Sequence, residues 1–322
     1  MDDNTVLVLA NPADPHLALL EHLPPDTSIA VGERTEAFER TAPEASVILN
    51  WSGTRELLEQ VFRMAPRLRW VHSRSAGLED LLFPALVESG ITLTNARGVF
   101  SQSLGEFVIA AALFFAKDLR RMVRSQMAGV WDQFDIAMLS GGTMGIVGYG
   151  EIGRAAAARA KAMGMRVLAL RRHPHRSAGD PLVDAVFPAE QRRELLAQSD
   201  YIVITAPLTT ETRGLIGAGE LAVMKPTAVL INVGRGPVVD EAALLEALAS
   251  GRIRGAALDV FDQEPLPAGH PLYGLENVLL SPHCADHTPD WQEQTMRFFL
   301  ENYRHFHNGE PLRNVVNKRL GY

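Results

Sequence analysis

The chain has almost no cysteine. Cys284 is the one cysteine in 322 residues, which excludes an intramolecular disulfide and any zinc or iron–sulfur site built from cysteines. No apolar run approaches the roughly 18 residues that a membrane span requires, and the segment Met1–Asn4 is acidic where a secretory signal carries positive charge. We therefore expect a cytoplasmic protein with no membrane partner.

Positive charge is also in deficit. The chain has 31 Lys and Arg against 38 Asp and Glu, which gives a net charge of −7, so we expect no nucleic-acid partner. Apolar residues make up 47% of the chain and charged residues 21%, a composition typical of soluble globular proteins. The length favours roughly two domains, each with its own core.

Short strand-like runs alternate with helical stretches in the first hundred residues. Residues 55–64 have helical spacing, and the runs at 5–10, 46–51, 68–73 and 91–94 are apolar or β-branched. This alternation predicts βα units around a parallel sheet.

A second series of strand-like runs begins at Thr143. Most of its members are separated by helical spacing, and they are TMGIV, MRVLAL, YIVITA, AVLINV, GAALDV and NVLLS. Six strands at this rhythm match a complete dinucleotide-binding domain. Between the two series, residues 101–124 contain no Pro and no Gly after Gly105, so we expect one long helix that crosses between the domains.

The strand pattern ends after Ser281, and we expect residues 289–307 to form a final helix that packs back on the first domain. The first domain is then discontinuous. We predict an α/β protein of two doubly wound domains, one formed by residues 1–102 and 287–322, and the other by residues 103–286.

A glycine-rich turn opens the second series. The motif G-x-G-x-x-G consists of Gly148, Tyr149, Gly150, Glu151, Ile152 and Gly153. By itself it is weak evidence in a chain with 26 glycines, but here it follows a predicted strand and opens an Ala-rich helix. Its glycines permit a tight turn and close approach of a pyrophosphate, and the helix N-terminus favours an anion. The turn therefore predicts a dinucleotide site.

The residues that end the next strand bear on which dinucleotide is used. About 20 residues after the glycine motif, an NAD site places an acidic residue on the ribose 2′-hydroxyl. Here the residues are Arg171 and Arg172, followed by His173, His175 and Arg176. Guanidinium groups suit a 2′-phosphate, so we expect NADP(H) to be preferred, with NAD(H) left open; the alternative is a set of solvated loop charges.

Three chemically capable residues follow later strands of the second series. Arg235 lies in NVGRG, Glu264 in QEPLP and His283 in SPH, each just after a predicted strand. Ligands of doubly wound sheets bind outside the carboxyl ends of the strands, so these side chains can converge there. An arginine for a carboxylate, a histidine to pass a proton and a carboxylate to tune the histidine are sufficient to reduce a 2-oxo acid.

The sequence resembles the D-isomer-specific 2-hydroxyacid dehydrogenase family over nearly its whole length. The matching segments are SRSAGLEDL (73–81), TNARGVFSQSLGEFV (94–108), VGYGEIG, TAPLTTETRGLIG (205–217), INVGRGPVVDEAAL (231–244), ALDVFDQEPLP (257–267) and SPHCADHT (281–288). The resemblance implies a Rossmann-like dinucleotide-binding domain inserted into a discontinuous flavodoxin-like substrate domain. It also implies an NAD(P)-dependent reduction of a 2-oxo acid to a D-2-hydroxy acid, similar to glyoxylate or hydroxypyruvate reduction, by a homodimer.

The same resemblance assigns roles to residues of the second domain. Arg235 is similar to the arginine that binds the substrate carboxylate and polarises the 2-oxo group, His283 to the proton donor–acceptor, and Glu264 to its carboxylate partner. The implied cofactor contacts beyond the glycine turn are Ala206, Pro207, Val233, Gly234 and Asp259.

In the first domain, the segment Ser75, Ala76 and Gly77 resembles the loop whose backbone N–H groups hold the substrate carboxylate. Trp51 lies where family members shape the substrate pocket, although a core tryptophan is the equal alternative. The sequence leaves open whether Arg74 faces solvent or a charged group of the substrate.

Two further questions concern ligands and partners. His283, Asp286 and His287 form H-x-x-D-H, but no further well-placed ligand appears and the family chemistry needs none, so we expect no metal. The apolar segment 107–115, with the arm that reaches Trp131, is a candidate dimer interface; burial within one chain is the alternative. Competing functions on the same fold are a dinucleotide-sensing, corepressor-like interaction protein and a phosphoglycerate dehydrogenase-like enzyme.

Overall fold

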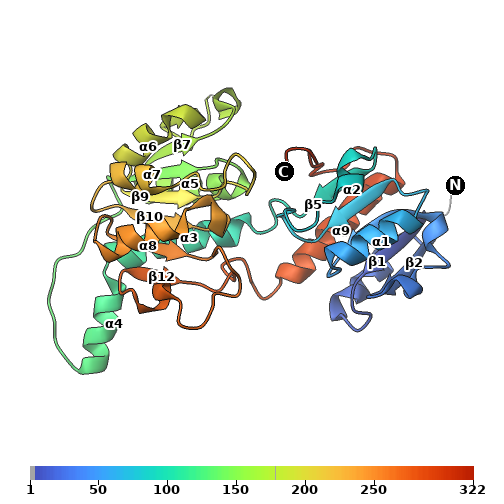
Figure 1. The fold of residues 1–322 in the computed structure, drawn as a ribbon, viewed down its shortest axis with the longest axis horizontal. Helices are drawn as coiled ribbons and strands as arrows, with labels where there is room; N and C mark the ends of the chain where they lie inside the picture. The colour runs from blue at the N-terminus through green and yellow to red at the C-terminus, as the bar shows by residue number, and fades with distance from the viewer. Residues whose placement is uncertain (1–3, 178) are drawn as a thin grey trace. The chain divides into compact units, whose positions relative to one another are not determined.

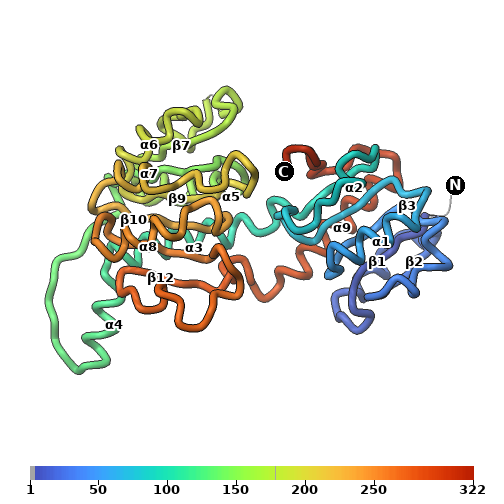
Figure 2. Tube along the Cα trace, viewed as in Figure 1, coloured from blue at the N-terminus to red at the C-terminus, as the bar shows by residue number. Residues whose placement is uncertain are grey.

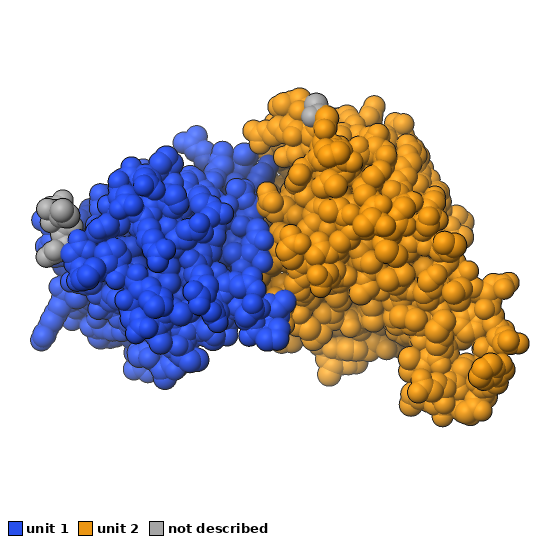
Figure 3. Space-filling view, turned by 180° about the vertical axis from the view of Figure 1, so that it is seen from behind, with its two compact units in different colours: residues 1–99, 288–322 blue, residues 100–287 orange. Residues whose placement is uncertain are grey.

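The computed structural model describes residues 4–177 and 179–322. The chain divides into two compact units, coloured separately in Figure 3. Met1–Val99 and Thr288–Tyr322 form unit 1, and Phe100–His287 form unit 2. Unit 2 is thus a continuous segment of chain, whereas unit 1 is assembled from both ends of the sequence.

Unit 1 contains a five-stranded parallel sheet with the order β2-β1-β3-β4-β5. Its strands are β1 (Asn4–Leu9), β2 (Thr27–Gly32), β3 (Ala45–Asn50), β4 (Trp70–Ser73) and β5 (Thr92–Asn95). Its α-helices are α1 (Arg55–Met64), α2 (Pro84–Glu88) and α9 (Trp291–His307), and its short 3₁₀ helices are η1 (Pro15–His22), η2 (Thr35–Ala37) and η3 (Ala42–Glu44).

Both faces of this sheet are buried, as expected for parallel strands. Alternate residues of β3 enter different apolar clusters: Ile48 packs with residues of α1, and Val47 and Leu49 pack with residues of α9. The hydroxyl oxygen of Thr54 accepts a hydrogen bond from the N–H of Leu57, 3.3 Å away, which caps the start of α1.

Helix α9 completes the core of unit 1, as the sequence pattern predicts. Phe299 and Tyr303 are fully buried, and the ring of Phe299 stacks on Trp70 of β4 with centroids 5.5 Å apart. Figure 2 shows this last helix lying among elements from the start of the chain.

Unit 2 contains a seven-stranded parallel sheet with the order β12-β11-β10-β9-β6-β7-β8 (Figure 1). Its strands are β6 (Thr143–Val147), β7 (Arg166–Leu170), β8 (Ala185–Phe187), β9 (Tyr201–Ile204), β10 (Val229–Asn232), β11 (Gly255–Leu258) and β12 (Val278–Leu280). Its helices are α3 (Ser101–Ala116), α4 (Leu119–Ala128), α5 (Glu151–Ala162), α6 (Arg192–Gln198), α7 (Ala218–Val223), α8 (Glu241–Ala249), η4 (Pro174–Ser177), η5 (Ala189–Gln191), η6 (Gly236–Val238) and η7 (Pro271–Gly274).

Helices cover both faces of this second sheet. Ile202 and Ile204 of β9 pack in a cluster with residues of α6, α7 and α8, whereas Tyr201 and Val203 pack in a cluster with residues of α3 and α5. Together with unit 1, this arrangement confirms the α/β class with two doubly wound, Rossmann-like domains.

One sequence-based prediction of an element is wrong, and two strands are missed by the sequence pattern. The single helix expected over residues 101–124 is divided into α3 and α4, because Asp118 adopts a left-handed conformation with φ = 47°. Strands β2 and β8 were not expected. The first carries Thr and Ser among its apolar residues, and the second is only three residues long.

Among the described residues, none of the helices combines the length and the apolar character needed to cross a bilayer.

Candidate active site

The glycine-rich turn joins β6 to α5 in unit 2, and a side chain would be excluded from its glycine positions for different structural reasons or not at all. Gly148 has φ = +96°, and a Cβ at this position would lie 2.5 Å from the backbone nitrogen of Ala206. A Cβ on Gly153 would lie 2.9 Å from the carbonyl oxygen of Gly148, so this glycine lets α5 approach the turn closely. A Cβ on Gly150 would meet nothing within 4 Å, which leaves open space at the start of the helix.

This open space suits a phosphate group. Gly150 is the N-cap of α5, which begins with Glu151 and Ile152, and the first N–H groups of a helix have no partner inside the helix. Together with the positive end of the helix dipole, they form a site for an anion. The residues present therefore fit the pyrophosphate of a dinucleotide.

A cationic segment follows β7. Nη1 of Arg171 donates a hydrogen bond to Oγ of Ser177 at 2.6 Å, and Arg172 pairs with Glu211. His173 and His175 lie with ring centroids 5.8 Å apart. Desolvation and then neighbouring cations, with Arg176 the first of them, lower the pKa of His173. The positively charged residues that the sequence analysis singled out thus lie together directly after β7.

The remaining backbone segments expected near a cofactor lie at the carboxyl ends of β9 and β10. Ala206 and Val233 are buried, and Pro207 follows Ala206 in the loop after β9. A Cβ on Gly234 would lie 2.9 Å from the carbonyl oxygen of Ala206, so the two loops are in close contact.

Arg235 lies in a turn that the preceding asparagine holds. Oδ1 of Asn232 accepts a hydrogen bond from the N–H of Gly234 at 3.0 Å, and its Nδ2 donates to the carbonyl oxygen of Arg235 at 3.0 Å. A Cβ on Gly236 would come within 2.0 Å of the backbone of Phe261, so the chain after Arg235 lies directly against the loop that follows β11. The guanidinium Nη1 of Arg235 donates to the carbonyl oxygen of Gly234 at 2.8 Å.

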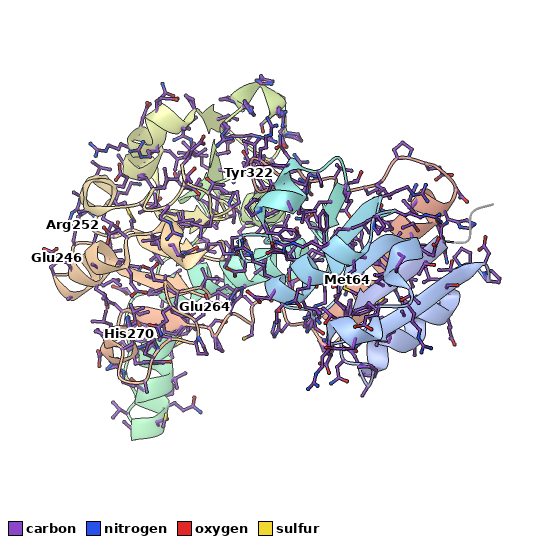
Figure 4. The ribbon with its side chains drawn as sticks, turned by 45° about the vertical axis from the view of Figure 1, so that its right-hand side comes forward. Met64, Glu246, Arg252, Glu264, His270 and Tyr322 are labelled. Carbon is purple, nitrogen blue, oxygen red and sulfur yellow. The ribbon has the colours of Figure 1, made fainter. Side chains whose placement is uncertain are left out.

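Glu264 and His283 form a direct pair. Oε2 of Glu264 lies 2.6 Å from Nδ1 of His283, and its Oε1 accepts a hydrogen bond from the N–H of Phe261 at 2.9 Å. The carboxylate is therefore fixed at one oxygen and holds the imidazole with the other (Figure 4 labels Glu264). Nδ1 is thus engaged by the carboxylate, and Nε2 is the ring nitrogen left for a reacting group. The His283 side chain is 41% exposed, so a ligand can reach it.

Asp259 is a buried anchor for the segment that carries His283. It is 1% exposed, and its Oδ1 accepts hydrogen bonds from Oγ of Ser281 at 2.5 Å, the N–H of Cys284 at 3.0 Å and the N–H of Ala285 at 3.1 Å. These bonds bracket His283, whose own backbone has φ = 51°. Asp259 therefore fixes the strained turn that presents the imidazole.

The segment after this turn is partly buried. Burial raises the pKa of Asp286, and Nε2 of His287 lies 3.7 Å from its Oδ1. Sγ of Cys284 lies 3.5 Å from Oγ of Ser281. Within residues 4–177 and 179–322, no group of three His, Cys, Asp or Glu side chains has a geometry that could hold a metal ion.

In unit 1, the loop Ser75–Gly77 follows the carboxyl end of β4. The N–H of Ser75 donates to Oγ of Ser73, and the carbonyl oxygen of Ala76 accepts from Nδ2 of Asn95 at 2.6 Å. Among the described residues, the N–H groups of Ala76 and Gly77 have no acceptor, so they are available to an anion.

Trp51 follows the carboxyl end of β3 and is buried, with 1% of its surface exposed. Its indole N–H donates to Oδ2 of Asp14 at 2.8 Å, and the guanidinium carbon of Arg74 lies 4.9 Å from the centre of its ring. Trp51 is therefore a core residue, and it also contacts the carboxylate of Asp14 and the guanidinium of Arg74.

Sequence reasoning did not single out Asn232, Ser281 or Asp14. Asn232 and Ser281 precede the candidate residues within the motifs NVGRG and SPH, so their places in the motifs were the available signal. Asp14 has no such signal, since its partner Trp51 is 37 positions away along the chain.

A helix-capped glycine turn and a carboxylate–imidazole pair, both at the carboxyl ends of one doubly wound sheet, define an oxidoreductase that uses a nicotinamide dinucleotide. The chain belongs to the D-isomer specific 2-hydroxyacid dehydrogenase family: the model of that family's NAD binding domain matches residues 109–285. This match confirms the resemblance seen in the sequence.

Individual relatives extend the likeness to nearly the whole chain. A glyoxylate reductase of Thermococcus gammatolerans is 38% identical over 270 residues, which cover 81% of this chain and 80% of the relative. A D-isomer specific 2-hydroxyacid dehydrogenase from Xanthobacter autotrophicus, solved in complex with NADPH and MES, is 32% identical, with a TM-score of 0.85 and complete coverage of both chains. The NADPH-dependent glyoxylate/hydroxypyruvate reductase of Sinorhizobium meliloti, solved with NADP and sulfate, is 26% identical, with a TM-score of 0.84 over 99% of this chain and 100% of that one.

Proposed function

We propose that this enzyme reduces a small 2-oxo acid to the D-2-hydroxy acid, with glyoxylate and hydroxypyruvate as the first substrates to consider. The observation that carries the proposal is the 2.6 Å contact between Glu264 and Nδ1 of His283, on loops that follow neighbouring strands of the sheet that also bears the glycine turn. The names of the relatives support the same substrate class.

Each residue has a defined task in this reaction. His283 gives a proton from Nε2 to the oxygen that was the 2-oxo group, and Glu264 stabilises the imidazolium and fixes the ring orientation. Arg235 binds the substrate carboxylate and polarises the carbonyl. Bound nicotinamide supplies the hydride. In the reverse direction the neutral imidazole takes the hydroxyl proton, because the same groups must serve both directions.

The two units divide these tasks. We assign unit 2 to the dinucleotide, through the turn at Gly148–Gly153, the loops at 206–207 and 233–234, and Asp259. We assign unit 1 to the substrate, whose carboxylate accepts hydrogen bonds from the N–H groups of Ala76 and Gly77. The proposed compartment is the cytoplasm, since one cysteine in the chain fits a reducing environment.

NADPH is the preferred reductant in this proposal. Arg171 and Arg172 stand at the end of β7, where an acidic residue would accept the 2′-hydroxyl of NAD. Guanidinium groups bind a phosphate dianion through paired, charge-assisted hydrogen bonds. The relatives solved with NADPH or NADP support this choice.

The enzyme is proposed to be a homodimer. Helix α4 and the segment after it extend from the body of unit 2 in Figure 1. They carry large apolar side chains that are strongly exposed. Met127 is 84% exposed, Trp131 90% and Met138 72%. Apolar patches of this kind mark protein interaction sites, and a second copy of the same arm is the proposed partner.

The experiment that tests activity and cofactor choice is the oxidation of NADPH and NADH in the presence of glyoxylate, hydroxypyruvate or pyruvate. Arg171→Asp is expected to lower the ratio of kcat/KM for NADPH over NADH by roughly 10- to 100-fold, because it removes a phosphate ligand and places a carboxylate near the ribose.

Arg166→Asp is the matched control. Arg166 is exposed at the opposite end of the same strand, so its replacement is expected to leave the ratio as it is. No turnover with any 2-oxo acid, despite tight dinucleotide binding, would reject the reductase and favour a dinucleotide-sensing protein. An unchanged ratio in Arg171→Asp would reject the 2′-phosphate contact.

A further inference from the structure

A second charged centre lies at the carboxyl ends of the unit 1 strands. Asp14 lies beyond β1, Trp51 directly after β3 and Arg74 directly after β4, and Trp291 is the first residue of α9. We call these four residues the Arg74 cluster. In the order β2-β1-β3-β4-β5 the chain reverses its winding between β1 and β3, which is where ligands of such sheets bind.

The guanidinium of Arg74 is held by aromatic faces. Its central carbon lies 4.9 Å from the centre of the Trp51 ring and 5.4 Å from that of Trp291. Contacts of this kind are attractive because the face of an aromatic ring is electron-rich. They engage the face of the guanidinium and leave its N–H donors unused. Within the described residues, these donors have no hydrogen-bond acceptor.

Asp14 does not supply the missing acceptor. Its Oδ2 accepts from the indole N–H of Trp51 at 2.8 Å, and its Oδ1 accepts from the N–H of His16 at 2.9 Å and lies 3.0 Å from Nδ1 of the same residue. Burial would raise the pKa of Asp14, but these hydrogen bonds hold it below its usual range, so the carboxylate is charged. The Asp14 carboxylate therefore attracts the Arg74 guanidinium electrostatically without accepting a hydrogen bond from it.

A half-buried cation with unused donors is costly unless a ligand completes it. Burial lowers the pKa of Arg74, and Asp14 opposes that effect. The planar fork of an arginine matches a carboxylate or a phosphate through two parallel hydrogen bonds. Arg74 also directly precedes Ser75–Gly77, the loop proposed to hold the carboxylate of the 2-oxo acid.

We infer that Arg74 is a specificity-determining residue that binds a second anionic group, a carboxylate or a phosphate, on the side chain of the 2-oxo acid. This inference rests on the proposed function, since it assumes that the substrate carboxylate lies at Ser75–Gly77. The enzyme then favours dianionic 2-oxo acids over glyoxylate. Trp51 and Trp291 orient the guanidinium, and Asp14 limits how strongly it attracts anions.

The test compares kcat/KM for pairs of substrates that differ by the second anionic group. Oxaloacetate and 2-oxoglutarate against glyoxylate report a carboxylate, and 3-phosphohydroxypyruvate against hydroxypyruvate reports a phosphate. For the pair that the wild-type enzyme favours, Arg74→Met is expected to lower the ratio roughly 10- to 100-fold, mostly through KM.

Asp14→Asn provides a change in the opposite direction. It removes the negative charge near Arg74 and keeps the shape of the side chain, so the same ratio is expected to rise. A residue with only a structural role would lower both members of each pair together. Asp14→Asn also keeps the inference testable if Arg74→Met fails to fold.

Arg69→Met is the matched control at the opposite end of the same strand. Arg69 directly precedes β4, at its amino end, and its guanidinium carbon lies 4.6 Å from the ring centre of Phe306. It therefore shares the stacking of Arg74 but not its position, and its replacement is expected to leave the substrate ratios as they are.

The outcomes separate the two proposals. If the wild-type enzyme reduces none of these substrates, the proposed function is wrong. If it reduces glyoxylate and neither ratio changes in Arg74→Met or Asp14→Asn, the role of Arg74 is wrong while the reductase stands. An equal loss for both members of a pair in Arg74→Met likewise overturns the inference.

Discussion

In unit 2, the loops that follow β6 and β10 carry glycines that let backbone segments approach closely, whereas in unit 1 the ends of β3 and β4 carry a large aromatic and a charged side chain. A Cβ on Gly148 or Gly234 would collide with backbone atoms of the neighbouring loop, whereas Gly150 leaves open space at a helix N-terminus. Trp51 and Arg74 occupy the corresponding ends of β3 and β4 in unit 1. Both sheets are doubly wound and parallel, so the architecture does not explain the difference.

On the proposed division of tasks, the difference reflects what each unit has to recognise. A pyrophosphate is common to every dinucleotide, and backbone N–H groups at a helix start bind it without need of side chains. A 2-oxo acid differs from its competitors only in its substituent, which side chains must distinguish. We therefore expect substitutions in unit 2 to affect cofactor binding and chemistry, and substitutions in unit 1 to affect substrate choice and local stability.

The largest expected effect is at the carboxylate–imidazole pair of unit 2. His283→Ala removes the proposed proton donor, so turnover is expected to fall by about 10³-fold while dinucleotide binding is retained. Stopped-flow or steady-state oxidation of NADPH measures the first quantity, and fluorescence titration measures the second.

Its control is another histidine–carboxylate pair of the same unit. Nε2 of His270 lies 3.2 Å from Oε1 of Glu241 (Figure 4 labels His270). Because His270 has no proposed contact with substrate, His270→Ala is expected to retain turnover within a few-fold. Similar losses of turnover in the two variants would contradict a specific role for His283, because any histidine–glutamate pair would then have the same effect.

The next effect concerns the glycines that distinguish unit 2. Gly148→Ala forces a Cβ into the backbone of Ala206 at a positive φ, and is expected to cost about 2–5 kcal/mol of unfolding free energy. Gly150→Ala meets no protein atom and is expected to retain stability but weaken dinucleotide binding. Urea unfolding and dinucleotide titration of both variants test this division. Equal stability of the two would contradict the steric argument.

The smallest effect is a pH dependence that originates in unit 1. Complete burial lowers the pKa of His72 to about 3 from 6.5, so between these values the unfolded chain binds a proton that the folded one does not. Stability is therefore lost as the pH falls below about 6.5, by about 2 kcal/mol at pH 5 relative to pH 8.

Urea unfolding at pH 5 and pH 8 measures this loss. His72→Phe keeps the aromatic packing against Trp70 and Phe299 but cannot titrate, so its stability is expected to depend less on pH by that amount. An identical pH dependence in wild type and variant would mean that His72 is not buried in solution as it is in the structure.

The parts of the fold that could be predicted from the sequence were those with a strong local pattern. Apolar strands such as β9 and β10, the turn at Gly148 and the final helix fall in this group, because each is defined by residues that are neighbours in sequence. The break at Asp118 could not be predicted, since nothing in AKDLRR forbids a continuous helix and the break depends on how α4 leaves the body of unit 2.

The candidate site divides in the same way. Arg235, Glu264 and His283 were identified by residue type and motif, and the structure adds the direct contact of Glu264 with His283. The relation of Asp14 to Trp51, and of Arg74 to both tryptophans, exists only after β1, β3, β4 and α9 have assembled. No spacing in the sequence encodes these contacts.

The packing of α9 in unit 1 also sets an order of assembly during synthesis. The strands that leave the ribosome first lack the side chains of Met296, Phe299 and Tyr303, which fill the cluster beneath Trp70. Unit 2 is continuous and can fold while the end of the chain is still being translated. The part of the enzyme that is made first is therefore the part that is finished last, and until then one apolar face of its sheet lacks the cover of α9.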